Sequence, residues 1–323
     1  MQQKLNVSCI DLHSPYCPCM LAETNHCIMC SQLRGQSTCD CNWSGLCILY
    51  EKHWQPKICS SEQPTVRIEM ETNISRKELI ANNAYLLEFT VNEALAEELT
   101  KTGAFVFLRQ PNDPEYFHFP VGVMNITGQL VQVAVEDTGP KTNRLLTSNN
   151  DRIFVRGPYY NGILGQPWID NITCGTIILA TGGMGQAPAL AIGNKLLANK
   201  NDVIVIVAPG KVGEIFIGQK LRELGATVYA VDSLRRSGLG IIERLFESGR
   251  NIDLVVSTGP DQQHCSIITT MQNAEVNIPM AATNNATMCC GEGICGSCQR
   301  ETADNRTLRM CKVQADFTQF APS

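Results

Sequence analysis

The feature that most limits how this 323-residue chain can fold is the position of its 16 cysteines. Nine lie within residues 9–59 and five within residues 289–311, so the long middle of the chain holds only two. A secreted domain stapled by disulfides would be short, whereas residues 60–288 carry enough aliphatic sequence to build a core. The N-terminus also lacks the apolar segment of a secretory signal. We therefore expect both cysteine clusters to bind metal, in a cytoplasmic protein.

Composition excludes several classes of protein. Hydrophobic residues make up 44% of the chain and charged residues 18%, as in a folded globular protein of two or three domains. The formal net charge of −5 provides no general attraction for nucleic acid or for an anionic membrane. No stretch approaches the roughly 18 consecutive apolar residues of a membrane span. We expect neither a nucleic-acid partner nor a membrane span.

The first part of the middle segment has the pattern of short strands. β-Branched or alternating apolar runs are separated by polar breaks, and one helical pattern, residues 93–101, interrupts them. Strands with this spacing predict an antiparallel barrel or sandwich. The predicted strands are residues 65–74, 84–92, 104–110, 120–127 and 129–137.

After Asn171 near-continuous apolar strands alternate with helical patterns. This alternation predicts an α/β domain whose parallel sheet is covered on both faces. The predicted strands are residues 176–181, 202–208, 226–232, 252–258 and, as a fifth, 277–282. The predicted helices are residues 188–200, 213–225 and 239–249.

A glycine-rich turn follows the first strand of this α/β domain. Gly182, Gly183 and Gly185 permit a tight turn, and a helix is expected to begin at Ala187–Pro188. A diphosphate placed over the turn would meet free N–H groups and the positive end of the helix dipole. The alternative is a plain strand-to-helix connector. The spacing differs from the usual Rossmann fingerprint.

The C-terminal cysteines have the spacing C-x4-C-x2-C-x12-C, which is the plant-type [2Fe–2S] ligand pattern. Glycines between them would let backbone amides turn toward the sulfides, and the fourth ligand would arrive from the next strand. Zinc is the alternative, but zinc sites favour two C-x2-C pairs and only one is present. Cys289 is expected to be a spare thiol. The predicted ligands are Cys290, Cys295, Cys298 and Cys311.

Seven cysteines near the N-terminus are predicted to hold a second metal centre, because this segment has little aliphatic sequence for a core. One [4Fe–4S] cluster with spare thiols, two metal sites or structural zinc would each fit, and thiolates suit both iron–sulfur clusters and zinc. An iron–sulfur cluster is favoured over zinc. The candidate ligands are Cys17, Cys19, Cys27, Cys30, Cys39, Cys41 and Cys47.

In this order of motifs the chain resembles the electron-transfer subunit of the two-subunit, NAD-linked dihydroorotate dehydrogenases, over roughly residues 65–315. It is equally similar to the small flavoprotein subunit of NAD-dependent ferredoxin:NADP transhydrogenases, and both belong to the ferredoxin–NADP reductase superfamily. The resemblance implies a cysteine-rich head (1–62), an FAD-binding β-barrel (63–168), an NAD(P)-binding α/β domain (169–283) and a [2Fe–2S] module (284–323). The relatives lack the head.

The resemblance also implies cofactor-binding residues. Those implied for FAD are His118, Phe119, Pro120 and Val121 on one strand, Gly139, Lys141 and Thr142 in a second segment, and Gly157 and Pro158 in a linker. Those implied for the nicotinamide cofactor are Gly182, Gly183, Gly185, Ala187 and Pro188, with Thr258, Gly259 and Pro260 in place of the family's Cys-Gly-Pro.

Two positions depart from the family pattern. Gly122 replaces the serine or threonine that faces the flavin, and Thr258 replaces a cysteine. Arg235 and Arg236 would suit a 2′-phosphate and Asp232 a ribose hydroxyl, while the resemblance favours NADH.

The resemblance predicts a subunit that relays electrons between NAD(P)H, FAD and a [2Fe–2S] cluster, to or from a catalytic oxidoreductase subunit or ferredoxin. The alternative function is a non-catalytic, metal-stabilised adaptor that docks a catalytic partner and has lost nicotinamide chemistry.

Overall fold

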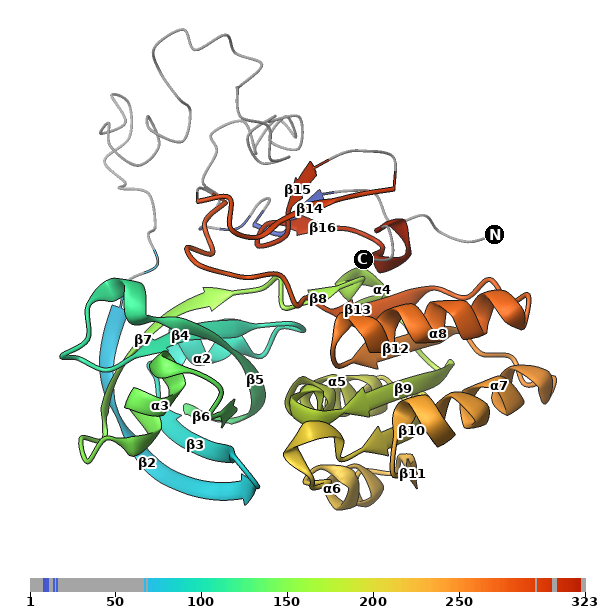
Figure 1. Ribbon diagram of the computed structural model, residues 1–323, viewed down its shortest axis with the longest axis horizontal. Coiled ribbons are helices and arrows are strands. Elements are labelled where there is room, and N and C mark those ends of the chain that lie inside the picture. Colours follow the sequence, from blue (N-terminus) through green and yellow to red (C-terminus); the bar gives the residue numbers. More distant parts are fainter. Residues whose placement is uncertain are drawn as a thin grey trace, which may run out of the picture.

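The computed structural model describes residues 8–11, 14, 16, 67, 69–293, 295–303 and 307–320 (Figure 1). The seven predicted metal ligands from Cys17 to Cys47 lie outside these residues, so the metal site of the head stays a prediction. Within the described ranges, no helix is both long and apolar enough to cross a membrane.

Six antiparallel strands close into a barrel in the order β2-β3-β6-β5-β4-β7, which confirms the predicted antiparallel architecture (Figure 1). Alternate residues along these strands, such as Val121 and Val123, are buried in the barrel core. Two short helices, α2 (Glu93–Leu99) and α3 (Pro140–Thr147), add leucines to that core. The strands are β2 (Glu69–Ala81), β3 (Ala84–Thr90), β4 (Phe105–Arg109), β5 (Phe119–Thr127), β6 (Leu130–Glu136) and β7 (Arg152–Tyr159).

The barrel differs from the sequence prediction at two strands. β2 runs to Ala81 instead of ending at residue 74, because its polar second half pairs with β3 and gains ladder hydrogen bonds there. β7 was not predicted, since its apolar alternation is short and ends in Gly157–Pro158. It nevertheless closes the barrel by pairing with both β2 and β4.

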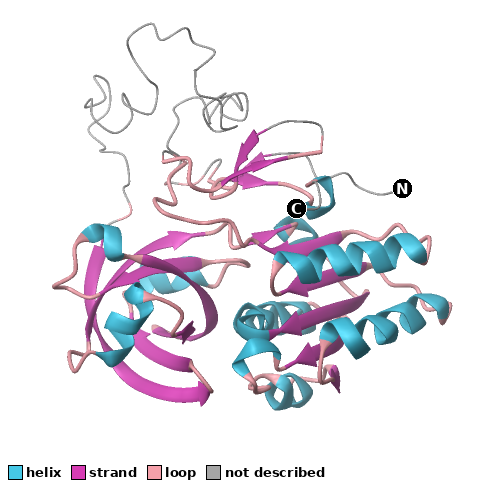
Figure 2. Cartoon of the chain, viewed as in Figure 1, coloured by secondary structure: helices cyan, strands magenta, loops and turns pink. Residues whose placement is uncertain are grey.

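The second domain is a six-stranded sheet in the order β11-β10-β9-β12-β13-β8, with helices on both faces (Figure 2). Alternate residues of β9 enter two different apolar clusters: Ile177 and Leu179 face one side, and Ile178 and Ala180 face the other. The strands are β8 (Ile163–Leu164), β9 (Thr176–Gly182), β10 (Asp202–Ala208), β11 (Thr227–Ala230), β12 (Leu254–Thr258) and β13 (Met280–Thr283). The helices are α4 (Gln166–Asn171), α5 (Gln186–Ala198), α6 (Gly218–Glu223), α7 (Leu239–Glu247) and α8 (Asp261–Asn273).

The sheet confirms five parallel strands but is mixed, because β8 pairs with β13 in the antiparallel direction. α6 is shorter than predicted, beginning at Gly218, because the Gln186 side chain bonds the backbone of Glu214 and Phe216 and holds that segment out of a helix. α8 was not predicted, since its sequence, DQQHCSIITTMQN, alternates weakly between polar and apolar residues.

The cysteine-bearing C-terminus forms two small sheets beside the barrel (Figure 1). β14 (Gln299–Glu301) pairs with β15 (Thr307–Arg309), and β16 (Val313–Gln314) pairs with β1 (Ser8–Cys9) from the other end of the chain. Residues 8–11 therefore pack against the C-terminal module.

Barrel and sheet are joined by a shared apolar cluster. Met124 and Leu86 of the barrel belong to the same cluster as Ala187 and Leu190 of α5. We expect Met124→Ala to lower the free energy of unfolding by about 2–4 kcal/mol, because it removes buried apolar contacts and leaves a cavity. Leu79→Ala, at a side chain that is 56% exposed, should change it by no more than about 0.5 kcal/mol. Urea unfolding of both variants measures the difference, and equal losses would contradict this packing.

Candidate functional site

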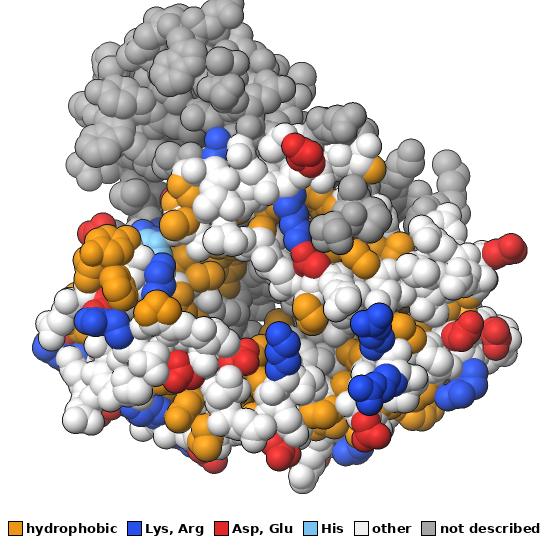
Figure 3. Space-filling view, viewed as in Figure 1, with side chains coloured by type: hydrophobic (Ala, Val, Ile, Leu, Met, Phe, Trp, Pro, Cys, Tyr) orange, Lys and Arg blue, Asp and Glu red, His pale blue; other side chains and the backbone are white. Residues whose placement is uncertain are grey.

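A cavity of about 1390 Å³ lies between the barrel and the α/β domain, and the surface is hollowed there (Figure 3). β5 lines it on the barrel side, while the glycine turn after β9 and the loop after β12 line it on the sheet side. In the sheet, β10 and β11 lie on one side of β9, and β12 and β13 lie on the other side. The direction in which the chain adds strands therefore reverses between β9 and β12, and the cavity opens there. In α/β sheets this reversal point, at the carboxyl ends of the strands, is where ligands bind.

Eleven of the predicted cofactor-binding residues line the cavity and six do not. Those that line it are Phe119, Pro120, Val121, Thr142, Gly182, Gly183, Gly185, Ala187, Pro188, Gly259 and Pro260. Those that do not are His118, Gly139, Lys141, Gly157, Pro158 and Thr258. Asp232 and Arg235 also border the cavity, whereas Arg236 does not.

On the barrel side, consecutive residues of β5 line the cavity. Phe119 and Val121 are also buried in the barrel core, whereas Pro120 and Gly122 are exposed. A Cβ atom added at Gly122 would meet no atom within 4 Å. The glycine therefore leaves open space at the position where the family carries a hydroxyl.

His118 faces the cysteine loop, which we define as residues 289–298. Its Nε2 donates to the carbonyl oxygen of Cys289 at 2.6 Å, and Arg156 Nη2 lies 3.3 Å from this His118 Nε2. Burial, with the nearby Arg156 charge acting in the same direction, lowers the pKa of His118. Lys141 donates to the backbone carbonyl of His118 at 3.0 Å. The predicted flavin residue thus connects the barrel to the cysteine loop.

The glycine turn packs tightly against the loop after β12. Gly183 has a φ of +57°, a conformation that favours glycine. A Cβ atom at Gly185 would lie 2.2 Å from the carbonyl oxygen of Thr258, so only glycine permits this approach. The turn leads directly into α5, which begins at Gln186, one residue before the predicted start. The first turn of α5 faces the cavity. A diphosphate here would meet the positive end of the helix dipole.

A buried polar network supports the loop after β12, and sequence reasoning missed it. His264 is fully buried, with Ser257 Oγ 2.7 Å from its Nδ1 and Thr283 Oγ1 3.1 Å from its Nε2. The Thr283 hydroxyl donates its proton to the carbonyl of Gly259 at 2.9 Å, so its oxygen accepts from His264 Nε2–H. The other ring nitrogen, Nδ1, then accepts from the Ser257 hydroxyl. Burial holds the pKa of His264 at about 4. The ring is therefore neutral and fixes the loop that borders the cavity.

The cysteine loop is shaped by three glycines with positive φ: Gly291, Gly293 and Gly296. Backbone amides reach two sulfurs, since Glu292 N donates to Cys290 Sγ at 3.2 Å and Cys311 N to Cys298 Sγ at 3.4 Å. These amides point toward the sulfurs of two predicted ligands, and the positive-φ glycines let the backbone of the loop turn.

Three of the four predicted ligands are linked by hydrogen bonds. A hydrogen bond with Cys311 lowers the pKa of Cys298, and hydrogen bonds with Cys290 and Cys298 raise the pKa of Cys311. Cys295 is exposed, with its sulfur 3.1 Å from Ser297 Oγ. Across the described part of the chain, no three His, Cys, Asp or Glu side chains are grouped closely enough to hold a metal ion. Cysteine thiolates are the ligand type of a [2Fe–2S] cluster, and the cluster at these residues stays a prediction.

We expect the stability of the protein to fall in acid because of His264. An unfolded histidine takes up a proton below about pH 6.5, whereas the buried ring does so only near its pKa of about 4. The contribution of His264 to the free energy of unfolding is thus fully present above pH 6.5 and falls by roughly 3 kcal/mol as the pH drops to 4. Urea unfolding from pH 4 to 8 should show this loss in the wild type and a smaller one in His264→Gln. Equal pH dependence in both proteins would contradict the neutral buried ring.

Comparison with known proteins supports the recognition made from the motifs. No protein-family profile matches the chain. The electron transfer subunit of dihydroorotate dehydrogenase B (NAD(+)) from Clostridium perfringens is 24% identical over 218 residues, which cover 67% of this chain and 84% of that protein. A Thermotoga maritima homolog of that subunit is 24% identical over 253 residues, 76% of this chain and 84% of that protein.

Solved structures share the fold. The NADH-dependent reduced ferredoxin-NADP oxidoreductase, studied for flavin-based electron bifurcation, aligns with a TM-score of 0.58 and 19% identity, covering 76% of this chain and 90% of the other. Phthalate dioxygenase reductase, a modular structure for electron transfer from pyridine nucleotides to [2Fe–2S], aligns with a TM-score of 0.51 and 14% identity, covering 76% and 95%. The chain is thus a homologue of the electron transfer subunits of NAD-dependent dihydroorotate dehydrogenase B, with a fold of the ferredoxin–NADP reductase type.

Proposed function

We propose that this chain relays electrons between NAD(P)H, FAD and a [2Fe–2S] cluster, to or from a partner oxidoreductase subunit or ferredoxin in the cytoplasm. One observation carries the proposal: the cavity at the sheet's reversal point is bordered by β5, which connects through His118 to the cysteine loop. The names of the homologues support the same activity.

Both cofactors have residues suited to them. FAD exchanges hydride with nicotinamide and single electrons with iron–sulfur clusters. Pro120 and Gly122 would lie along the flavin, because they line the cavity and are the exposed residues of that part of β5. Thr142, which also lines the cavity, accepts from the backbone N–H of Gly139 at 3.2 Å and so fixes the start of α3.

The nicotinamide cofactor would bind on the sheet side of the cavity. Its diphosphate would lie at the glycine turn, where Ala187 and Pro188 begin α5. Asp232 and Arg235 border the same cavity, so a ribose hydroxyl or a 2′-phosphate would each find a partner. The ratio of activities with NADH and NADPH distinguishes the two.

The cysteines would hold the iron. Cys290, Cys298 and Cys311 are linked by hydrogen bonds, and Cys295 on the exposed side of the loop would complete the set. The head would hold a second centre through Cys17 to Cys47, as an iron–sulfur cluster or zinc. Iron and zinc analysis of the full chain decides between these metals. Protein that contains only the iron of the C-terminal cluster, and no zinc, would contradict a metal centre in the head.

The proposal is tested by reconstituting the full chain with FAD, iron and sulfide. We expect a flavin absorbance band and its anaerobic bleaching by NADH or NADPH, since both binding regions border one cavity. A [2Fe–2S] electron paramagnetic resonance signal should then appear on reduction. Protein without bound flavin, or with flavin that neither nucleotide bleaches, would contradict the relay function.

Gly122 provides a second test. Because its Cβ position is open, Gly122→Ser places a hydroxyl in the cavity without a clash. We expect flavin reduction by the nicotinamide cofactor to become about tenfold faster, as one added hydrogen bond would allow. Gly122→Ala is the matched control, because it adds the same carbon without the hydroxyl and should leave the rate near that of the wild type. Stopped-flow absorbance measures all three rates.

The same variants separate the two candidate functions. A wild type that binds flavin but is not reduced, together with a Gly122→Ser protein that is reduced, would favour the adaptor function. Equal acceleration by serine and alanine would show that filled volume, and not the hydroxyl, limits the rate.

A further inference from the structure

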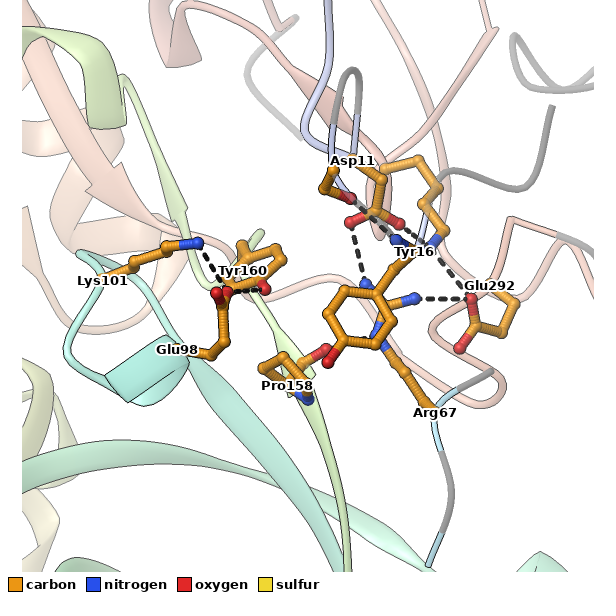
Figure 4. Close-up of polar contacts among 10 residues, drawn as sticks. Asp11, Tyr16, Arg67, Glu98, Lys101, Pro158, Tyr160 and Glu292 are labelled. Carbon is orange, nitrogen blue, oxygen red and sulfur yellow. Dashed lines mark hydrogen bonds and ion pairs between the residues drawn. The ribbon is translucent and has the colours of Figure 1, made fainter. Parts of the chain in front are cut away.

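Four charged side chains from four separate chain segments meet beside the cysteine loop (Figure 4). Arg67 Nη2 lies 2.9 Å from Asp11 Oδ1, and Arg67 Nη1 lies 3.0 Å from Glu292 Oε2. Lys312 Nζ lies 2.5 Å from Asp11 Oδ2 and 3.1 Å from Glu292 Oε2. Each cation therefore contacts both anions, in a closed ring that we call the charge ring.

The charge ring is mostly buried. The side chains of Asp11 and Lys312 are 1% exposed and that of Arg67 is 3% exposed, whereas Glu292 is 26% exposed. Burial would raise the pKa of Asp11, but Lys312 and Arg67 hold it below its ordinary value. Burial would lower the pKa of Lys312, but Asp11 and Glu292 raise it. Each charge of the ring therefore has opposite charges beside it, and removing any one member leaves a buried charge uncompensated.

Three members of the ring are placed by the backbone around the cysteines. Lys312 follows the predicted ligand Cys311, and Glu292 donates its backbone N–H to the sulfur of Cys290. Asp11 is held next to Lys312 because β1 pairs with β16 and Ile10 N donates to the carbonyl of Lys312 at 2.7 Å. The N-terminal segment thus supplies a counter-charge to the cysteine module.

Arg67 ties the ring to the barrel. Its guanidinium carbon lies 4.6 Å from the ring centre of Tyr159 and 4.6 Å from that of Tyr16, and its Nε donates to the carbonyl of Pro158. Tyr159 ends β7, which closes the barrel. Because guanidinium is planar, it can stack on both aromatic rings while donating to carboxylates in its own plane.

We propose that the charge ring is an electrostatic clamp that positions the cysteine loop and sets the reduction potential of the cluster it holds, with Asp11 and Lys312 acting in opposite senses. The inference rests on the proposed [2Fe–2S] site. Reduction adds one negative charge to the cluster, so a nearby buried cation favours the reduced form and a nearby buried anion opposes it. With two cations and two anions, the intact ring balances these effects.

The test is the midpoint potential of the [2Fe–2S] cluster in the reconstituted full chain, measured by electron paramagnetic resonance during a redox titration. Lys312→Met removes a cation and should lower the potential. Asp11→Asn removes an anion and should raise it. The double variant should lie between the two singles. A ring that only braces the loop would give shifts of the same sign in both singles, because both would loosen it, and that result would overturn the electrostatic role.

A control pair has the same charges at a remote place. Lys220 and Glu223 form an ion pair 3.9 Å apart whose side chains are 59% and 54% exposed. Lys220→Met and Glu223→Gln should leave the potential unchanged, since exposed charges are screened by water and salt. If Lys312→Met does not fold, Arg67→Gln takes its place, and as the loss of the other cation it should lower the potential, opposite to Asp11→Asn.

Cluster-free protein separates this inference from the proposed function. The clamp predicts that Asp11→Asn and Lys312→Met each lower the urea midpoint of the apo-protein, and that the double variant loses less than the two losses added together. Additive losses would overturn the clamp. A wild type that takes up no [2Fe–2S] cluster but shows this coupling would contradict the proposed function and the effect on the potential, and would leave the positioning role of the clamp.

Discussion

A network of buried amide side chains holds the three described modules in register, and the cavity depends on it. Asn161 Nδ2 donates to the carbonyl of Val313 at 2.9 Å, and Gln314 Nε2 donates to Asn161 Oδ1 at 2.7 Å. Asn284 Nδ2 donates to the carbonyls of Asn161 and Met310, each at 2.7 Å. Because buried amides are costly unless they are bonded, this network permits one arrangement of barrel, sheet and cysteine module.

Two apolar clusters reinforce that arrangement. One contains barrel residues such as Met124 together with α5, and the other contains Phe107 and Tyr159 of the barrel together with Leu308 and Met310 of the cysteine module. The barrel also has a core of its own, but the cavity and the cysteine loop are built by contacts between modules. Changes at these contacts therefore alter the site as well as the stability.

Local sequence signals predicted the parts of this structure that local forces determine. Strand alternation identified five of the six barrel strands, and the glycine turn at Gly182–Gly185 was recognised because its backbone conformation needs glycine. β7 was missed because its pattern is short and ends in Gly157–Pro158. α8 was missed because its pattern is weak.

The sequence carried no signal for contacts made across long separations. Asp11 and Lys312 are 301 residues apart, and nothing near either one indicates an ion pair. His264 lies on a helix without clear amphipathic character, and its partners Ser257 and Thr283 lie on two different strands. The contact of His118 with Cys289 likewise depends on how the modules pack.

The hydrogen bond between His118 and Cys289 gives the two ends of the cysteine loop different environments. On the cavity side, His118 joins β5 to Cys289, so covalent and hydrogen bonds run without interruption from Pro120 to Cys290. Two residues after Cys290, Glu292 forms ion pairs with the two cations of the charge ring. Cys290 is therefore held from both sides, whereas Cys295 is exposed. In an electron relay, such a loop would receive electrons at its fixed end and offer its exposed end to a partner.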